Sequence, residues 1–302
     1  MKILLTGGTG FIGSRLLQLS YKYLSPETEM ILLTSRPVEG YRCIIHNQYT
    51  FSKEDFYDAG VTHIDTVIHL GHYVDKLVDD KVEYGSIQSI TNTIHLINNL
   101  PNTPETFIYS SSCAVYGENR PDVLSETSIA MPDSIYATSK LMIEMVLRKW
   151  AEDNGVNLNI LRLGHIYGPN DNRNYSIPIW LQAVFNHKPI QLYANPQMKR
   201  NCLYIDDCCK FLLKAIYVHQ GNRVFNIVSN YTASMLEIAE ICKKVSKNPF
   251  EISITENYSE GELGMEIECS QDVHAFLGSE EYSLEEGLEK EFDYFKVRRN
   301  QG

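Results

Sequence analysis

Apolar runs alternate with amphipathic segments along the first half of the chain, and this alternation predicts the fold. Short and almost wholly apolar runs are typical of buried parallel strands, whereas apolar residues at helical spacing predict covering helices. The predicted strands are residues 2–6, 30–34, 42–46, 66–70, 106–109 and 158–163. The predicted helices are residues 14–24, 52–59, a segment within 79–100, and 136–154. Such repeated alternation predicts an α/β fold with a doubly wound parallel sheet.

From residue 170 onward the predicted elements become shorter. The expected helices are residues 177–186, 206–219, 235–247 and 283–295, and the expected strands are 190–193, 202–205, 224–228 and 251–255. We therefore divide the chain into a first domain, residues 1–169, and a smaller α/β lobe, residues 170–302. The two are expected to interleave, with residues 202–228 returning to the main sheet. Asp206 and Asp207 begin one of these helices, where aspartate is favoured, so we interpret them as capping residues rather than a catalytic pair.

A glycine-rich loop joins the first predicted strand to the first predicted helix. Its spacing, G-x-x-G-x-x-G, lets the backbone approach a pyrophosphate at the N-terminus of a helix. This strand, loop and helix order predicts a Rossmann-type dinucleotide site. A glycine also follows the strand 66–70, where it lets a cofactor pass close above the sheet. The expected cofactor-binding residues of these two segments are Gly7, Gly10, Phe11, Ile12, Gly13, Leu70 and Gly71.

The end of the second predicted strand bears on the choice of cofactor. Dinucleotide sites that prefer NAD usually carry an aspartate or glutamate there, which binds the adenosine ribose. This chain has Thr34, Ser35 and Arg36 instead. Ser35 and Arg36 are suited to bind a ribose 2′-phosphate through charge-assisted hydrogen bonds. The cofactor is therefore expected to be NADP or NAD, with NADP favoured.

A serine, a tyrosine and a lysine form the candidate catalytic group. Tyr136 and Lys140 lie four residues apart on a predicted helix, so their side chains share one face. Such a pair is often only a surface pair, but an ammonium beside a phenol also lowers the phenol pKa and prepares it for acid/base chemistry. Ser112 follows a predicted strand, which places its hydroxyl at the carboxyl edge of the sheet, where open α/β sheets bind ligands.

Composition and charge exclude several classes of protein. The chain has 302 residues, 43% of them apolar, which is enough for a sizeable core. Its net charge of -11 argues against a nucleic-acid partner, and no apolar run approaches the roughly 18 residues of a membrane span. The seven cysteines lack metal spacing and two are adjacent, so we expect reduced thiols and a cytoplasmic protein. His69 and His72 have no third ligand nearby, and no metal is expected.

Taken together and in this order, the motifs resemble those of extended short-chain dehydrogenase/reductases of the nucleotide-sugar epimerase, dehydratase and reductase group. The resemblance covers nearly the full chain. The matching stretches are residues 7–13, 67–70, 110–117, 136–140, 162–169, 204–207 and 225–227, with weaker matches at 276–278 and 284–288. The resemblance implies a nicotinamide cofactor in the N-terminal sheet and a nucleoside-diphosphate sugar between the two lobes.

The resemblance also implies roles for individual residues. Tyr136 would be the acid/base at a sugar hydroxyl or keto oxygen, and Lys140 would bind the nicotinamide ribose and lower the pKa of Tyr136. Ser112 would orient the sugar oxygen, and Arg200 would bind the substrate diphosphate. Further residues expected to contact the substrate are His72, Cys113, His165, Asn174 and Tyr175. Relatives often pair the helices near residues 87–100 and 136–154 in a four-helix bundle, so we expect a homodimer.

Departures from the family pattern narrow the expected chemistry. Sugar 4,6-dehydratases carry an Asp-Glu pair after the active-site hydroxyl, whereas this chain has Cys113 and Ala114, which disfavours dehydration. A 4-epimerase or a 4-ketoreductase of a nucleoside-diphosphate sugar remains, and the Ser35-Arg36 segment favours reduction. A catalytically idle, cofactor-binding sensor is the alternative. Residues 257–265 lack the usual Arg-Pro-Gly-Asp stretch, so no second diphosphate-binding arginine is assigned.

Overall fold

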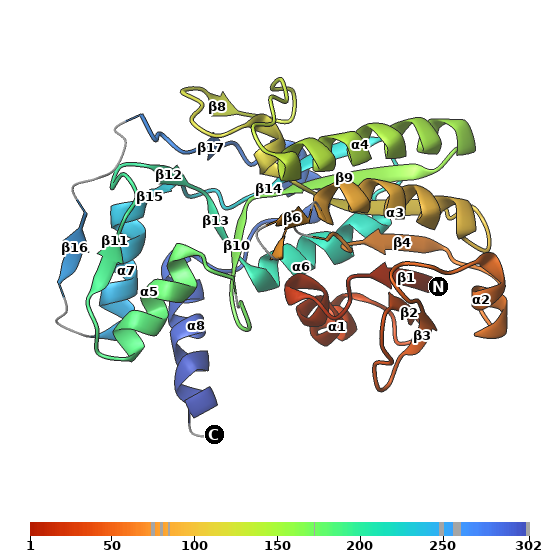
Figure 1. The fold of residues 1–302 in the computed structure, drawn as a ribbon, viewed down its shortest axis with the longest axis horizontal. Coiled ribbons are helices and arrows are strands. Elements are labelled where there is room, and N and C mark those ends of the chain that lie inside the picture. The colour runs from red at the N-terminus through yellow and green to blue at the C-terminus, as the bar shows by residue number, and fades with distance from the viewer. Residues whose placement is uncertain are drawn as a thin grey trace.

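A seven-stranded parallel sheet forms the centre of the protein. The computed structural model describes residues 1–73, 76–78, 81–83, 85–171, 173–247, 251–255 and 261–299. The strand order is β14-β9-β7-β4-β1-β2-β3, and every neighbouring pair is parallel (Figure 1). The strands are β1 (Lys2–Thr6), β2 (Glu29–Thr34), β3 (Arg42–Ile45), β4 (Thr66–His69), β7 (Thr106–Ser112), β9 (Asn157–Leu163) and β14 (Arg223–Ile227). The predicted doubly wound sheet is confirmed.

Helices cover both faces of this sheet. Side chains alternate across a strand, so neighbouring residues of β1 enter different cores: Ile3 packs in the cluster that includes Leu16 of α1, and Leu4 packs in the other. One face is covered by α1 (Phe11–Tyr23) and α6 (Ile205–Lys214), and the other by α2 (Lys53–Asp58), α3 (Gly85–Asn99) and α4 (Ile135–Asn154). Each fully buried leucine in these layers contributes about 1.5–3 kcal/mol through the hydrophobic effect.

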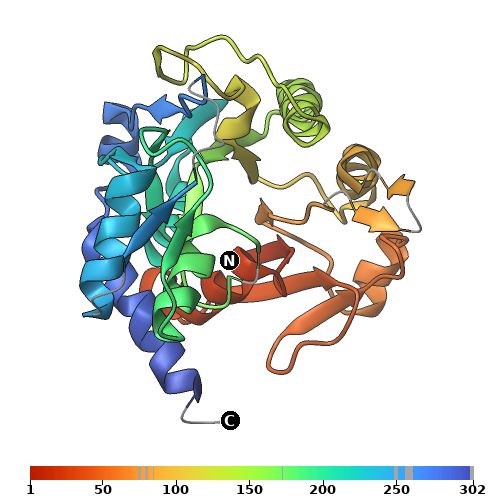
Figure 2. The same cartoon turned by 60° about the vertical axis from the view of Figure 1, so that its left-hand side comes forward.

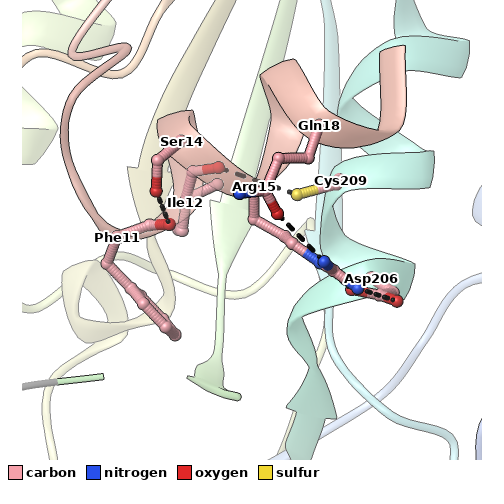
Figure 3. Close-up of polar contacts among 7 residues, drawn as sticks. All are labelled: Phe11, Ile12, Ser14, Arg15, Gln18, Asp206 and Cys209. Atoms are coloured by element: carbon pink, nitrogen blue, oxygen red, sulfur yellow. Dashed lines mark hydrogen bonds and ion pairs between the residues drawn. The ribbon is translucent and has the colours of Figure 1, made fainter. Parts of the chain in front are cut away.

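An ion pair fastens α6 to the helix that follows the glycine loop. Arg15 of α1 reaches Asp206 of α6 through two bonds, Nε to Oδ1 at 2.6 Å and Nη2 to Oδ2 at 2.8 Å (Figure 3). One turn later, the Cys209 thiol lies 3.7 Å from the carbonyl oxygen of Ile12. The two-bond geometry fixes the relative position of the helices, because a guanidinium fork matches a carboxylate. The ion pair therefore holds the start of α1 next to α6.

The shorter elements gather at one end of the sheet and build the smaller lobe. Its helices α5 (Ser176–Phe185), α7 (Met235–Ser246) and α8 (Leu284–Arg299) pack on one another. Figure 2 shows these green and blue elements on the side opposite the red and orange N-terminal strands. Short strand pairs complete the described structure: β5 (Lys76–Val78) with β6 (Lys81–Glu83), β8 (Val123–Leu124) with β17 (Glu266–Ile267), β11 (Ile190–Leu192) with β16 (Ile252–Ile254), and β12 (Lys199–Arg200) with β15 (Ala233–Ser234). Single turns occur at Cys113–Tyr116, Ala215–Tyr217 and Val273–Leu277.

Two sequence-based expectations need correction. Only the end of the segment 202–228 returns to the main sheet, as β14, whereas β13 (Cys202–Tyr204) pairs with β10 (His165–Tyr167) in a separate two-stranded sheet. The capping role of Asp206 and Asp207 was wrong, because α6 has no side-chain cap. Asp206 binds Arg15, and Asp207 accepts hydrogen bonds from the backbone N–H groups of Glu281 and Tyr282. Both contacts reach distant segments, which local helix preference does not reveal.

Candidate active site

The glycine loop is shaped by close backbone contacts. Gly7 has a φ of +71°, and a Cβ atom there would lie 2.8 Å from the amide nitrogen of Gly71. A Cβ atom on Gly13 would lie 2.1 Å from the carbonyl oxygen of Gly7. Gly10 precedes α1 without a side-chain cap, so the first amides of the helix are left for another acceptor. This cradle fits the diphosphate of a dinucleotide, because helix N-termini favour anions.

The second strand ends in an exposed, cationic segment. Ser35 and Arg36 are both exposed just beyond β2. Thr34 shapes the turn, since its hydroxyl donates a hydrogen bond to the carbonyl oxygen of Arg36 at 3.1 Å. The position next to β1 is where the adenosine ribose of a dinucleotide is expected in this fold. The arrangement therefore offers a hydroxyl and a guanidinium at that place.

The predicted serine, tyrosine and lysine converge on one cavity of about 700 Å³. Ser134 caps α4 by accepting a hydrogen bond from the backbone N–H of Ala137, so the helix begins just before Tyr136. Lys140, one turn later, is buried and donates a hydrogen bond from Nζ to the Ser110 carbonyl oxygen at 2.7 Å. Its Nζ atom lies 5.9 Å from the centroid of the Tyr136 ring. Ser112 joins the same cavity from the carboxyl end of β7.

The acid/base character of the pair differs from the sequence-based expectation. The pKa of Tyr136 is raised, not lowered, because burial of the phenol outweighs the opposing effects of the hydrogen bond with Ser112 and the charge of Arg173. Burial lowers the pKa of Lys140 to about 7, and nearby Glu144 only partly opposes this. In this arrangement burial outweighs any lowering by Lys140, and the expected effect of Lys140 beside a bound nicotinamide stays a prediction. The phenol retains its proton at neutral pH and is suited to act as an acid.

A buried ion pair lies close to Lys140, and the sequence analysis did not predict it. Glu144, one turn after Lys140 on α4, accepts two hydrogen bonds from Arg162 of β9, at 3.0 and 2.7 Å. The Ser111 hydroxyl donates a third at 2.5 Å. The Arg162 guanidinium also stacks 4.8 Å from the centroid of the Tyr116 ring. The only sequence signal was a carboxylate four residues after Lys140, on the same helical face.

All of the residues predicted to contact the substrate line the same cavity: His72, Ser112, Cys113, His165, Asn174, Tyr175 and Arg200. The His72 ring meets the Tyr136 ring edge-on, with centroids 5.3 Å apart. Burial is the main cause that lowers the pKa of His72 to about 2 and that of His165 to about 3, so both rings are neutral at physiological pH. The Cys113 thiol donates to the carbonyl oxygen of Arg162 at 3.2 Å. The predicted cofactor residues Ile12 and Leu70 also border the cavity.

The cavity contains two arginines, each paired with a carboxylate. Arg200 donates from Nη2 to Glu118 at 3.0 Å, and Arg173 forms two bonds to Asp171, at 2.7 and 2.8 Å. Arg173 and both carboxylates were missed by the sequence analysis. They belong to no motif, because the segments after the Cys113–Tyr116 turn and after β10 reach the cavity only through the fold. The cavity thus combines a buried acid/base group with cations suited to a phosphorylated ligand.

Fold and site together define a dinucleotide-binding protein with a Ser-Tyr-Lys centre at the carboxyl edge of a parallel sheet. The chain belongs to the NAD dependent epimerase/dehydratase family, whose model matches residues 3–228. The enzymes of this family act on nucleotide sugars. They include epimerases and dehydratases, so family membership does not identify the reaction of this chain. The Rossmann-type fold and the nucleotide-sugar family expected from the sequence are confirmed.

Individual relatives cover nearly the whole chain. The uncharacterized UDP-glucose epimerase YtcB of Bacillus subtilis is 23% identical, over 97% of this chain and 98% of its own. The dTDP-glucose 4,6-dehydratase of Haemophilus influenzae is 24% identical, over 98% of each chain. Among solved structures, the UDP-glucuronic acid 4-epimerase of Bacillus cereus in complex with NAD superposes with a TM-score of 0.82, at 23% identity and 99% coverage of both chains. Epimerases and dehydratases thus share this architecture.

The described ranges offer neither a membrane span nor a metal site. Among those residues, no helix combines the length and the apolar character needed to cross a bilayer. The same part of the chain contains no group of three or more histidine, cysteine, aspartate or glutamate side chains placed to hold a metal ion. His69 instead contacts the hydroxyl groups of Thr6 and Thr93, at 2.7 and 2.9 Å. It is therefore a hydrogen-bonded residue of the core.

Proposed function

We propose that this protein reduces a 4-keto nucleoside-diphosphate sugar with a nicotinamide cofactor, using Tyr136 as the acid. The supporting observation is that Ser112, Tyr136 and Lys140 share one cavity with Arg200, at the sheet edge beside the glycine loop. In this proposal residues 1–169 hold the cofactor, and both parts of the chain, residues 1–169 and 170–302, line the sugar-nucleotide site. A bound nicotinamide supplies or accepts the hydride at the sugar carbon.

The protein side of the reaction follows from the protonation of the three residues. Tyr136 gives its proton to the keto oxygen as that oxygen gains charge, and Ser112 orients the same oxygen by a hydrogen bond. Lys140 stabilises the resulting phenolate and, in the family pattern, binds the ribose. The raised pKa of Tyr136 favours this direction, because the phenol begins the reaction protonated. The reverse step, oxidation of a hydroxyl, needs the phenol deprotonated first.

The residues after Ser112 argue against 4,6-dehydration. Cys113 is buried, its thiol is committed to the Arg162 carbonyl, and burial raises its pKa well above the usual range. Ala114 has no ionisable group. Of the described carboxylates that line the cavity, Glu118 and Asp171 are paired with arginines, and Asp133 accepts the backbone N–H of Glu118. None of these carboxylates stands next to Ser112 in the sequence, where the dehydratase pair is expected.

The proposed preference for NADPH over NADH rests on the residues at the end of β2. Exposed Arg36 is available for a ribose 2′-phosphate, and Thr34 and Ser35 carry no negative charge to repel it. We therefore propose NADPH as the reductant. Titration of the protein with NADPH and NADH tests this choice, and Arg36→Gln should weaken NADPH alone. Equal affinity for both cofactors in the unaltered protein would contradict it.

A 4-epimerase is the second candidate. It is favoured because the same three residues can serve both removal and return of the proton at the sugar oxygen, and several similar solved structures are of 4-epimerases. Purification distinguishes the two. NADPH consumption with a UDP- or dTDP-4-keto sugar supports the reductase, whereas tightly retained NAD and conversion of a UDP-sugar to its 4-epimer support the epimerase. Dinucleotide binding without turnover of any of these sugars would instead support a sensor.

We also propose a homodimer formed through α3 and α4. Five large apolar side chains on these helices are exposed: Ile87, Ile94, Ile135, Met142 and Met145, with exposed fractions of 50%, 39%, 41%, 46% and 64%. Neighbouring exposed apolar residues favour association with another surface. Sedimentation should give twice the chain mass, and Met145→Glu should convert the dimer to a monomer. A monomeric unaltered protein at micromolar concentration would contradict this proposal.

A further inference from the structure

Arg173 lies between two aromatic rings that belong to different parts of the molecule. Its guanidinium carbon is 4.6 Å from the centroid of Phe11 and 4.5 Å from that of Tyr175. Phe11 is the first residue of α1, directly after the glycine loop, whereas Tyr175 precedes α5 of the smaller lobe. The arginine is thus a physical link between the predicted cofactor loop and the predicted substrate side. Stacking on both faces restricts the plane of the guanidinium.

Hydrogen bonds fix the same guanidinium along one edge. Nε and Nη2 bind the two Asp171 oxygens, and Nη2 also donates to the carbonyl oxygen of Ile166 at 2.7 Å. Asp171 is itself buried, with 1% of its side chain exposed, whereas 40% of the Arg173 side chain remains exposed. Within the described residues no hydrogen bond engages Nη1. Arg173 therefore borders the cavity with one edge of its guanidinium held by hydrogen bonds, while Nη1 remains available to an anion.

The surroundings of Arg173 favour a diphosphate as that anion. The stacked residue Phe11 begins α1, whose N-terminus has no side-chain cap and favours negative charge. The backbone cradle formed by Gly7 and Gly13 lies in the same loop. A dinucleotide diphosphate held by this loop would bring two negative charges next to a guanidinium that has one unengaged nitrogen. Asp171 neutralises only part of the local positive charge, because the N-terminus of α1 adds a partial positive charge to that of Arg173.

We infer that Arg173 contacts the dinucleotide diphosphate from the substrate side and thereby couples cofactor binding to the sugar-nucleotide site. This inference rests on the proposed function. When the diphosphate binds Nη1, Arg173 is held more firmly against Phe11 and Tyr175. Tyr175 and neighbouring Asn174 line the cavity, so the substrate side is ordered before the sugar nucleotide arrives. Coupling of this kind is reciprocal, and a bound sugar nucleotide tightens the cofactor by the same factor.

The experiment compares two arginines of the same cavity. Arg173→Met keeps an apolar stem but removes the donors, and Arg200→Met is the matched control. Cofactor affinity is measured by quenching of protein fluorescence with NADPH and by calorimetry with ADP-ribose, which carries the diphosphate without the nicotinamide. Arg173→Met should weaken both ligands about tenfold, the loss expected for one charge-assisted contact. Adenosine 2′-monophosphate, which lacks the diphosphate, should bind both variants equally, and Arg200→Met should leave NADPH affinity unchanged.

A second measurement tests the coupling itself. The affinity for UDP is determined with and without saturating NADPH, and the ratio is expected to be about fivefold or more in the unaltered protein. Arg173→Met should bring this ratio close to one, whereas Arg200→Met should weaken UDP binding and keep the ratio. If Arg173→Met is unstable by thermal melting, Arg173→Gln replaces it, since an amide retains a bond to Asp171 without the charge.

The outcomes separate this inference from the function on which it rests. Unchanged NADPH and ADP-ribose affinity in Arg173→Met, or an unchanged coupling ratio, overturns the role of Arg173 while leaving the proposed function intact. Failure of the unaltered protein to bind any nicotinamide dinucleotide overturns the proposed function itself. Equal loss of NADPH affinity in Arg173→Met and Arg200→Met also counts against the inference, because it indicates a general change in cavity charge.

Discussion

The cofactor side and the substrate side of the cavity are held by different kinds of interaction. On the cofactor side the backbone sets the geometry: a Cβ atom on Gly7 or Gly13 would collide with the main chain. On the substrate side, side chains from distant segments set it, as in the contact between Arg200 and Glu118, which lie 82 residues apart. The first kind leaves a residue pattern in the sequence, whereas the second does not. The backbone contacts are also harder to alter by substitution, because a side chain added at either glycine would meet the main chain.

The largest expected effect comes from the phenol that lies between the two sides. Tyr136→Phe removes the proton donor but keeps the ring that packs edge-on against His72. Turnover should fall a hundredfold to ten-thousandfold, the usual contribution of general acid catalysis, while NADPH affinity stays the same. Steady-state kinetics with a 4-keto sugar nucleotide and a cofactor titration measure the two quantities. Full activity in this variant would show that another group delivers the proton.

Two ion pairs that differ in burial, one next to Lys140 and one on the substrate side, can each be broken, which sharpens the comparison. Glu144→Gln leaves Arg162 buried without a counter-charge, and both side chains of this pair are nearly inaccessible, at 1% and 6% exposed. Urea unfolding should show a loss of about 3–5 kcal/mol, as for other buried pairs from which one partner is removed. Glu118→Gln, the counterpart at Arg200, should cost at most about 1 kcal/mol, because Glu118 is 39% exposed. Equal losses would mean that burial does not distinguish the pairs.

These contrasts also explain what the sequence alone could predict. The central strands were found because apolar runs such as residues 66–70 are typical of strands buried on both faces. Tyr136, Lys140 and the glycine loop were found because their spacing reflects one helix turn and one tight loop. The family resemblance then placed Ser112 and Arg200 at the same cavity, where the structure also has them.

The remaining site features depend on contacts that sequence spacing does not encode. Asp206 pairs with Arg15 across 191 residues, so a preference for capping was the nearest local explanation. Arg173 carries no motif, and its position follows from packing between Phe11 and Tyr175. The direction of the Tyr136 pKa was missed for a related reason, since burial of the phenol depends on the folded surroundings. Short pairs such as β10 and β13 likewise form only where the rest of the fold brings them together.

A glycine exchange tests the claim that backbone contacts determine the cofactor side. In Gly13→Ala the new methyl group would lie 2.1 Å from the Gly7 carbonyl oxygen, so the loop must move. NADPH affinity should fall at least about tenfold, with a stability loss of about 2–3 kcal/mol. Gly221→Ala is the matched control, because its φ of +75° is unfavourable for alanine but nothing lies within 4 Å. It should cost about 1 kcal/mol and leave cofactor affinity unchanged. Similar cofactor loss in both variants would refute the role of the close contact.

The smallest expected effect is a pH dependence confined to the substrate side. Glu291 of α8 is buried, and this burial, with a smaller effect of nearby Asp171, raises its pKa from 4.5 to about 8. The folded chain therefore keeps a proton between these pH values that the unfolded chain has lost. Its contribution to stability is complete below pH 4.5 and is lost as the pH rises through about 8.

Glu291→Gln isolates this contribution, because the amide keeps the shape and does not titrate. Between about pH 5 and about pH 9 the unaltered protein should lose about 1–3 kcal/mol of unfolding free energy relative to the variant. Hydrogen exchange at the higher pH should report faster opening of α8 in the unaltered protein, while α1, held by its ion pair to α6, should exchange alike in both. Parallel stability curves would show that Glu291 ionises normally. Faster exchange in α1 would show instead that the two sides open together, and the contrast between them would fail.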